Sequence, residues 1–216
     1  MRDVHCHILP GVDDGSRSME ESLQMVRAAM QAGVTSITCT PHCRDPWFDY
    51  DAMWDAFYAL KAELKNIEGA PSLSMGFEVN YKKIMELGLD WISYVACETG
   101  VFLFELPTRA LPSDWETIVF DAQGKGYTVI IAHPERYAAV QKDLDVVQRF
   151  IDAGCKIQVS ADFYEEDLFS PIKKTAKKLF EHDLVHYIAS DAHGPKTYET
   201  LAKVRREYHA RGAHAR

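Results

Sequence analysis

Residues 130–137 read IIAHPERY, an apolar run that leads directly into a loop opened by a histidine. A second stretch, IASDAH at residues 188–193, ends in the same way with an aspartate and a histidine. Short apolar runs of this kind are typical of buried β-strands, and α/β proteins place their functional side chains where such strands end. The two stretches therefore predict strands that deliver reactive or ligand-type side chains into one site.

Further runs of the same kind alternate with helical patterns along the whole chain, as expected for repeated βα units. The seven expected strands lie at residues 2–5, 34–40, 73–79, 101–106, 127–132, 156–160 and 186–190. Helices are expected at residues 18–33, 50–66, 114–123, 143–153, 171–181 and 198–210. Ser18 and Glu21 have the spacing of a capping box at the start of the first helix.

Six of the seven expected strands end in a histidine or a carboxylate. These residues are His5, His7, His42, Glu78, Glu105, His133, Asp191 and His193. Side chains two residues apart in a strand share a face, so His5 and His7 can reach one ion. Glu78 and Glu105 each close an apolar run, and a buried carboxylate needs a partner. Because nitrogen and oxygen donors without thiolate suit divalent cations such as manganese, iron or zinc, we predict one polynuclear metal site.

The composition is that of a globular protein. With 216 residues, of which 47% are hydrophobic, one domain spanning residues 1–216 is expected. A net charge of -8 argues against binding to nucleic acid, and no apolar run is long enough to insert into a membrane. Five scattered cysteines without a CxxC pair predict no disulfide framework and favour a cytoplasmic location.

Several sequence motifs of enzymes that bind or transfer phosphate are absent from the sequence. Phosphotyrosine hydrolysis by a cysteine nucleophile uses a cysteine six residues before an arginine, and none of the five cysteines has that spacing. Neither GxxxxGK nor GxGxxG occurs, which argues against a kinase or a dinucleotide-binding enzyme.

The motifs HCH (5–7), TPH (40–42), AHPER (132–136) and SDAH (190–193) resemble those of the PHP (polymerase and histidinol phosphatase) superfamily of metal-dependent phosphoesterases. The opening DVHCHILPGVDDGS (3–16) is similar to the PHP-type protein-tyrosine phosphatases of bacterial capsule and exopolysaccharide synthesis. The resemblance covers nearly the whole chain. It implies a distorted (β/α)7 TIM-like barrel with three divalent ions, commonly manganese, on its carboxyl-terminal rim.

The resemblance also implies a role for each motif residue. The first ion would be held by His5, His7, Glu78 and Asp191; the second by Glu78, Glu105 and His133; and the third by Asp14, His42 and His193. Arg136 would bind the phosphate. Family members usually carry a second phosphate-binding arginine after SDAH, whereas this chain has Lys196 near that place and no arginine before Arg205. Cys43 stands where a second histidine commonly follows TPH.

Charge supports phosphoester chemistry independently. Three divalent ions would outweigh the four predicted carboxylate ligands, so the site would stay positive and suit a phosphomonoester dianion. Bridging ions also lower the pKa of bound water, which gives a hydroxide for attack on phosphorus. The resemblance implies a protein-tyrosine phosphatase that acts on the tail of a bacterial tyrosine kinase controlling capsule synthesis.

Aromatic residues follow the ligand-bearing strands and are candidates for a substrate rim: Trp47, Phe48 and Tyr137. Such rings could stack on the phenyl group of the substrate. Alternatively, Trp47 and Phe48 hold their loop against the next helix. Two other functions stay open, namely a small-molecule phosphomonoesterase such as histidinol-phosphate phosphatase and a non-catalytic docking module for a kinase. The unbroken ligand set argues against the docking module.

Overall fold

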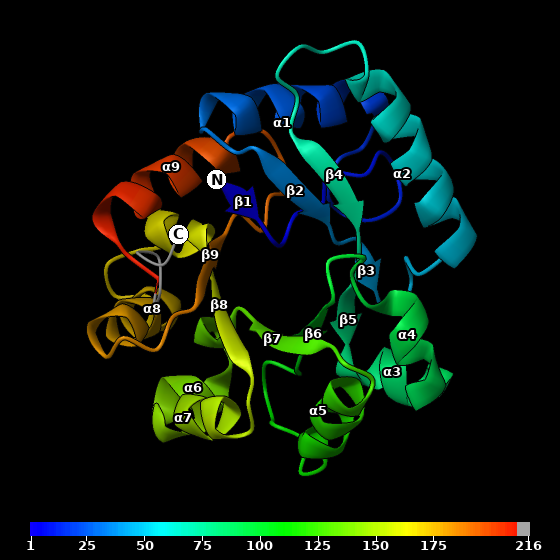
Figure 1. The fold of residues 1–216 in the computed structure, drawn as a ribbon. Helices are drawn as coiled ribbons and strands as arrows, with labels where there is room; N and C mark the ends of the chain where they lie inside the picture. The colour runs from blue at the N-terminus through cyan, green and yellow to red at the C-terminus, as the bar shows by residue number, and fades with distance from the viewer. Residues whose placement is uncertain (211–216) are drawn as a thin grey trace.

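The computed structural model describes residues 1–210 of the chain. Parallel strands occupy its centre, and helices surround them (Figure 1). The strands are β1 (Arg2–Asp3), β2 (Ser36–Cys39), β3 (His42–Cys43), β4 (Ser72–Met75), β5 (Glu78–Asn80), β6 (Val101–Glu105), β7 (Thr128–Ala132), β8 (Lys156–Ser160) and β9 (Tyr187–Ala189). They form two sheets, ordered β1-β2-β4 and β3-β5-β6-β7-β8-β9.

Each of the seven predicted strands is present, with two differences: the strand predicted at 73–79 is split into β4 and β5, and β3 adds a short strand just beyond the one predicted at 34–40. β3 continues β2 after Thr40 and Pro41, and β5 continues β4 after Gly76 and Phe77. Backbone bonds bridge the gap, since Gly76 N donates to Cys39 O at 2.9 Å and Glu78 N donates to Pro41 O at 3.1 Å. A Cβ at Gly76 would lie 2.2 Å from the sulfur of Cys97, so only glycine fits at this break.

The first and last strands meet beyond their regular ends. An isolated parallel bridge joins Cys6 to Ala192, flanked by hydrogen bonds from His7 N to Ala192 O (3.0 Å) and from Asp191 N to His5 O (2.9 Å). The strands therefore surround a common interior without forming one continuous ladder within residues 1–210. This arrangement confirms the predicted distorted (β/α)7 TIM-like barrel.

The helices are α1 (Met19–Gln31), α2 (Tyr50–Leu64), α3 (Tyr81–Leu87), α4 (Ile92–Val95), α5 (Trp115–Gly124), α6 (Ala138–Lys142), α7 (Asp145–Asp152), α8 (Pro171–Glu181) and α9 (Thr197–Glu207). The six predicted helices are confirmed to within a few residues. Those missed, α3, α4 and α6, have seven residues or fewer, too few for a helical period to show. Ser18 caps α1 by accepting from Glu21 N, but the Glu21 carboxylate accepts from Arg17 N, so only half of the predicted capping box forms.

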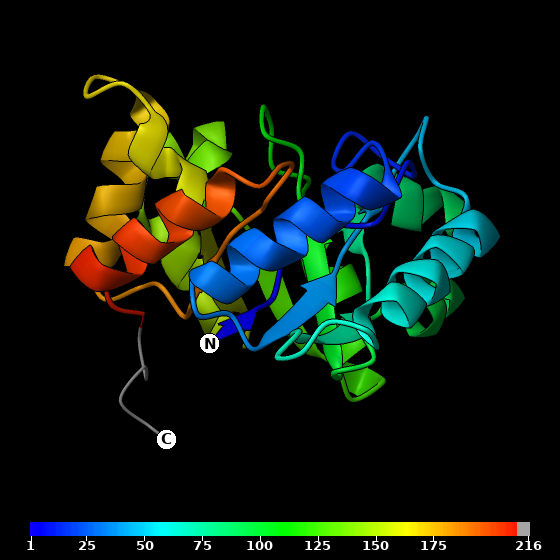
Figure 2. The same ribbon diagram turned by 90° about the horizontal axis from the view of Figure 1, so that it is seen from above.

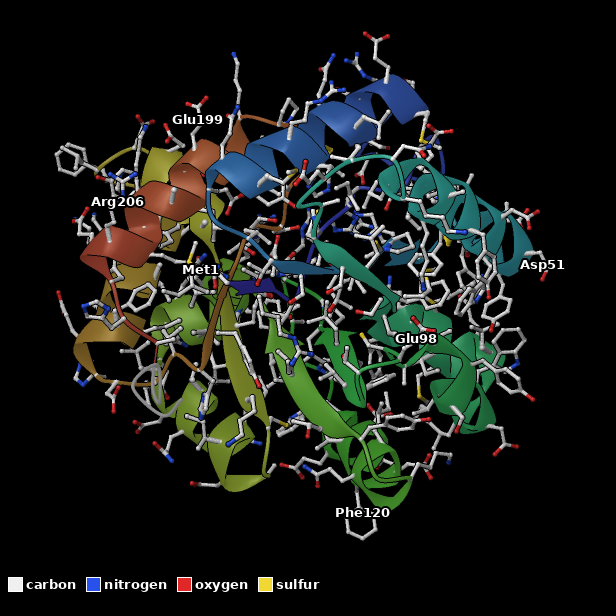
Figure 3. The ribbon with its side chains drawn as sticks, turned by 45° about the horizontal axis from the view of Figure 1, so that its top comes forward. Met1, Asp51, Glu98, Phe120, Glu199 and Arg206 are labelled. Atoms are coloured by element: carbon white, nitrogen blue, oxygen red, sulfur yellow. The ribbon has the colours of Figure 1, made fainter. Side chains whose placement is uncertain are left out.

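Figure 2 shows the helices lying around the strands, and Figure 3 shows side chains filling the space between the two. A small apolar cluster lies mainly on β6 and β7 and is formed by Cys97, Val101, Leu103, Ile130 and Ala132. A larger cluster packs the outer faces of the strands against the helices. Within the described residues, no helix has the length and apolar character needed to cross a membrane.

Candidate metal centre

Eight of the nine predicted ligands come together at the carboxyl ends of the strands. They form three groups of possible donors: His7, Asp14, His42 and His193; His5, His7 and Asp191; and His5, Glu78 and His133. In each group the nitrogen and oxygen donor atoms all lie within 4.8 Å of one another. Strands far apart in sequence therefore build one continuous site, as the strand-end pattern predicts.

Glu78, at the start of β5, is the buried hub of this site. Its Oε1 atom lies 2.6 Å from His133 Nε2 and 3.6 Å from His5 Nε2. Its Oε2 atom lies 2.6 Å from His42 Nδ1 and 3.5 Å from His7 Nε2. One carboxylate thus contacts four imidazoles, and this position suits a ligand that bridges two ions.

His5, His7 and Asp191 form the deepest group, and all three are buried. His5 Nε2 and His7 Nε2 lie 3.1 Å apart, and Asp191 Oδ1 lies 3.3 Å and 3.4 Å from them. Ligands about 2.1 Å from one ion stand roughly 3.0–3.4 Å apart in octahedral or tetrahedral geometry. The three donors therefore have the spacing of ligands to a shared divalent ion.

Asp14, His42 and His193 form the outer group. Asp14 Oδ1 lies 3.1 Å from His42 Nε2 and 3.4 Å from His193 Nε2. The His193 ring stacks on His7 with centroids 4.2 Å apart. Because the side chain of Asp14 is 40% exposed whereas His7 is fully buried, the site opens to solvent on this side.

Buried polar atoms in the centre lack hydrogen bonds within the described part of the chain, among them His42 Nδ1, Glu78 Oε2 and His133 Nδ1. His42 Nδ1 and Glu78 Oε2 lie 2.6 Å apart but are not aligned as donor and acceptor. Each such atom costs about 1–3 kcal/mol unless something compensates it. Glu78 Oε2 also lies 3.5 Å from His7 Nε2, among the donor atoms of the centre, where a cation would satisfy it. The residues present therefore fit divalent metal ions.

The buried carboxyls and imidazoles of the centre shift one another's pKa. Burial works against ionisation of Glu78 and Asp191, but neighbouring charges, led by His5, hold the pKa of both carboxyls well below its usual range. Burial would also lower the pKa of His5, yet Asp191 and Glu78 raise it to about 9. Incoming cations must displace protons from these imidazoles, so affinity for metal should increase with pH.

Glu105 is the one predicted ligand outside the three donor groups. Its Oε2 atom accepts from Asn80 Nδ2 at 2.8 Å, and its Oε1 atom accepts from Arg44 Nη1 at 3.4 Å. His5 takes the place beside Glu78 and His133 that the resemblance implies for Glu105. Asn80 and Arg44 therefore supply hydrogen bonds to the carboxylate of Glu105, which the sequence predicted to be a metal ligand.

Arg136 reaches the centre, as predicted. It lies in a 3₁₀ turn, Pro134–Arg136, directly after His133, and its Nη2 atom donates to Asp191 Oδ2 (3.0 Å) and Asp162 Oδ2 (2.6 Å). Its acidic neighbours in sequence, Glu135 and Asp143, do not form ion pairs with it. Lys196 is exposed at the start of α9, in a groove that Asp162 also lines.

The three aromatic residues predicted to form a substrate rim lie in different environments. Trp47 stacks on the ring of His42 at 5.4 Å and therefore lies beside the metal centre. Phe48 packs edge-on against Phe77 and Trp91, so it holds the loop in place.

The rim prediction is wrong for Tyr137, which is 2% exposed. Its hydroxyl donates to Ala132 O (2.7 Å) and accepts from Leu106 N (3.0 Å). These two backbone groups stand at the ends of β7 and β6 and need partners, which explains why the phenol turns inward.

Sequence reasoning missed the residues that orient the donors. Asp13 Oδ2 accepts from His7 Nδ1 at 2.8 Å and from His42 N at 3.1 Å. His7 holds the pKa of Asp13 below its usual range, against the effect of burial. Gly15 allows the loop to approach, since a Cβ there would lie 2.1 Å from His7 O. The available signal was the acidic pair at 13–14, of which only Asp14 was assigned.

Of the seven predicted strands, the one at residues 156–160, which is β8, is not followed by a predicted ligand. It supplies residues that orient the ligands instead. Gln158 Oε1 accepts from His5 Nδ1 at 3.0 Å, and Ser160 Oγ donates to Asp191 Oδ2 at 3.0 Å. Hydrogen bonds of this kind fix the tautomer and direction of a ligating imidazole. Gln158 and Ser160 therefore orient the side chains of His5 and Asp191 in the centre.

Two donors sit on strained backbone. His133 has φ 33° and Asp191 has φ 52°, which is the left-handed region that non-glycine residues seldom adopt. Such conformations cost about 1–3 kcal/mol each and cluster at functional sites. His133 directly follows β7 and Asp191 lies two residues beyond the end of β9, so the strain accompanies the sharp turns that direct these side chains into the centre.

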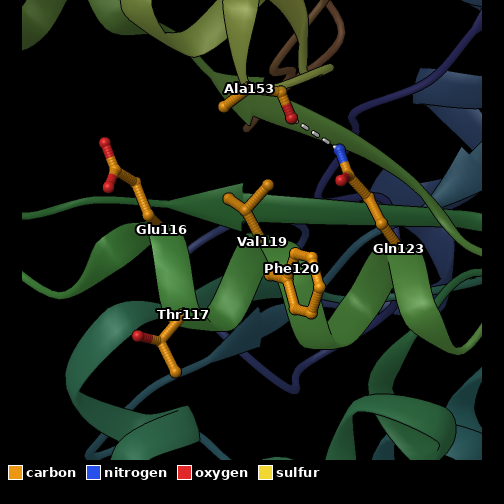
Figure 4. A pocket seen from close by; sticks show the side chains of 6 residues that line it. All are labelled: Glu116, Thr117, Val119, Phe120, Gln123 and Ala153. Atoms are coloured by element: carbon orange, nitrogen blue, oxygen red, sulfur yellow. Dashed lines mark hydrogen bonds between the residues drawn. The ribbon is translucent and has the colours of Figure 1, made fainter.

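A second concave surface lies on α5 and lacks this chemistry (Figure 4). It is lined by Glu116, Thr117, Val119, Phe120, Gln123 and Ala153. Gln123 Nε2 donates to Ala153 O at 2.9 Å across it, and Phe120 is 79% exposed and points away from the protein (Figure 3). With no cluster of possible metal donors there, the strand-end centre is the candidate active site.

Known proteins resemble the chain over nearly its full length. A family model described as "Capsular polysaccharide synthesis, CpsB/CapC" matches residues 1–211. The tyrosine-protein phosphatase YwqE of Bacillus subtilis (strain 168) is 30% identical over 200 residues, which cover 91% of this chain and 79% of YwqE. The tyrosine-protein phosphatase CpsB of Streptococcus agalactiae serotype V is 31% identical over 89% of this chain and 83% of CpsB.

Solved structures agree with these relatives. The chain matches one from the crystal structures of YwqE from Bacillus subtilis and CpsB from Streptococcus pneumoniae with a TM-score of 0.82 and 28% identity. The match covers 96% of this chain and 87% of the other. Those two proteins are described as unique metal-dependent tyrosine phosphatases.

Proposed function

Because this chain belongs to the CpsB/CapC family of capsular polysaccharide synthesis proteins, we propose that it is a metal-dependent protein-tyrosine phosphatase. The observation that carries the proposal is the convergence of eight predicted ligands into three adjacent donor groups. A buried site of this kind, with an arginine at its edge, suits a phosphate dianion.

Three divalent ions, manganese in the first place and otherwise iron or zinc, would occupy the three groups. The deep group (His5, His7, Asp191), the group around Glu78 and the outer group (Asp14, His42, His193) would each hold one. When bound, such ions polarise a phosphoryl group and lower the pKa of coordinated water. Glu105 is assigned to the second ion on the family pattern, although it contacts Arg44 and Asn80 here.

The residues of the chain would bind and orient the substrate. Arg136 presents a guanidinium that is one-third exposed beside Asp191, where it can donate to phosphate oxygens. Trp47 offers an aromatic face next to His42 on which a phenyl ring can stack. Asp13, Gln158 and Ser160 hold the donor side chains in fixed directions.

We further propose that the substrate is a phosphotyrosine in a flexible segment of a tyrosine kinase that controls capsule or exopolysaccharide synthesis. The family description names capsular polysaccharide synthesis and the relative CpsB is named a tyrosine-protein phosphatase, which supports a phosphotyrosine substrate in that process. The kinase follows from the resemblance of the sequence motifs to the PHP-type phosphatases. All five cysteines are unpaired and buried, which supports a reducing compartment such as the cytoplasm.

A phosphotyrosine peptide should be hydrolysed at least about 100-fold faster, by kcat/KM, than the same peptide carrying phosphoserine. A phenolate with pKa near 10 leaves with little help from an acid, whereas an alkoxide needs protonation. Phosphate release from the two peptides and from histidinol phosphate, measured with manganese-loaded protein, tests this expectation. If histidinol phosphate has the highest kcat/KM, the small-molecule phosphatase replaces this proposal.

Replacing Arg136 with alanine should lower kcat/KM about 100-fold or more, equivalent to about 2.7 kcal/mol, because one donor to the phosphate is lost. Metal content should not change, since no donor to the ions is removed. Arg149→Ala is the matched control, because Arg149 forms only a surface pair with Glu116 at 3.5 Å among the described residues. An effect below threefold would mean that Arg136 serves only to pair with Asp162 and Asp191.

A further inference from the structure

Arg44 extends from the loop after β3 into the open side of the metal centre. Its Nη2 atom donates to His42 Nε2 at 2.9 Å and lies 3.6 Å from Asp14 Oδ2. Its Nη1 atom donates to Glu105 Oε1 at 3.4 Å. All three partners are predicted metal ligands, so this guanidinium occupies the space between donors of the second and third ions.

The side chain of Arg44 is placed to meet a ligand from solvent. It is 30% exposed, and its guanidinium lies 5.0 Å from the centroid of the Trp47 ring. Stacking on an aromatic face holds a guanidinium while leaving its N–H groups available. One of these donors, the buried Nε, has no hydrogen-bond partner within the described chain.

Arg44 and Arg136 pair with different members of the donor set. Arg136 pairs with Asp191 and Asp162, whereas Arg44 pairs with Asp14 and Glu105, and they have no partner in common. A phosphate monoester presents several oxygens, and each guanidinium can bind two of them. The two arginines could therefore hold one phosphate between them.

Two basic residues closer to the carboxyl end, Lys196 and Arg205, are less suitable than Arg44 for binding phosphate at the centre. Lys196 is exposed at the start of α9, where Asp162, Glu165 and Glu199 line the same groove. The Nη2 atom of Arg205 donates to backbone oxygens of Arg2 and Ile188, at strands β1 and β9. Neither has the contact with predicted metal ligands that Arg44 has.

We propose that Arg44 is a second phosphate-binding residue, which holds the substrate phosphate opposite Arg136; this inference rests on the proposed phosphatase function. Cations bound by Asp14 and His42 would take the atoms that Arg44 now contacts, and would repel its charge. A phosphate bound at the open side of the metal centre would give the guanidinium of Arg44 new hydrogen-bond acceptors. Arg44 therefore competes with the ions for their ligands and cooperates with them in binding phosphate.

Calorimetric titration of Arg44→Gln separates these effects. With inorganic phosphate as the probe and manganese-loaded protein, the dissociation constant should increase at least about tenfold relative to the unsubstituted protein. With manganese as the probe and metal-free protein without phosphate, the dissociation constant should stay the same or decrease. Arg44→Lys should lie between the two proteins for phosphate, because a lysine keeps the charge but loses the planar pair of donors.

Arg17→Gln is the matched control, because it removes the same charge from an exposed pair with Glu21. The inference is overturned if Arg44→Gln and Arg44→Lys both bind phosphate as the unsubstituted protein does. It is equally overturned if Arg44→Gln weakens manganese binding as much as phosphate binding, since Arg44 would then only maintain the donor geometry. If the unsubstituted, manganese-loaded protein itself neither binds phosphate nor hydrolyses phosphotyrosine, the proposed function has failed.

Discussion

Exhaustive chelation of the purified protein is expected to abolish hydrolysis of phosphotyrosine peptides, and manganese(II) is expected to restore it. The imidazoles and carboxylates of the centre contact one another and suit metal binding, and bound ions would supply the nucleophile by lowering the pKa of coordinated water. The cysteines offer no alternative. All five thiols are buried, and burial raises the pKa of Cys43, Cys97 and Cys155 to about 12.

Two controls separate metal dependence from loss of structure. Circular dichroism of the chelated protein should show that the fold persists, because the core between strands and helices does not involve the donors. Iodoacetamide should leave the activity of the manganese-loaded protein unchanged, because thiols that are buried and protonated react slowly. Full activity after chelation, or inactivation by alkylation of a cysteine, would contradict the proposed chemistry.

Replacing Glu78 with glutamine should lower kcat/KM by at least about a thousandfold, equivalent to about 4 kcal/mol. Glutamine has nearly the same shape but lacks the charge of a carboxylate that contacts four imidazoles: His5, His7, His42 and His133. The amide would also direct an NH2 group at one of these rings. We expect a lower manganese stoichiometry in plasma emission spectrometry together with the loss of activity.

Glu116→Gln provides the matched control, since Glu116 is exposed on α5 outside the metal centre. It should change neither metal content nor activity. If Glu78→Gln folds, keeps its full metal content and retains more than a tenth of the activity, then Glu78 does not bridge ions.

The predictable part of the centre follows from strand geometry. His5 and His7 share a face because side chains alternate, and parallel strands bring their carboxyl ends to one edge of the fold. The expected relationship to the PHP-type phosphatases of capsule synthesis is confirmed by the family match. Seven of the eight converging ligands could be identified because each follows or ends an apolar run, whereas Asp14 was assigned only through the family resemblance.

The rest depends on contacts that no local pattern reveals. Glu105 faces Arg44 and Asn80, which lie 61 and 25 residues away in sequence. Tyr137 turns inward because backbone groups at the ends of two strands need its hydroxyl. Asp13 could not be told from its neighbour Asp14, since only the folded loop decides which of them reaches His7 and which reaches His42.

The bridge between Cys6 and Ala192 joins two segments that are 186 residues apart in sequence. These segments follow the first and the last strand of the barrel. During synthesis on a ribosome, Asp191 and His193 emerge 186 residues after His5 and His7. Contacts between such distant segments form late, because closing long loops is entropically costly. The complete donor set therefore cannot form until Asp191 and His193 have emerged, and the full set of metal ions can bind only after that point.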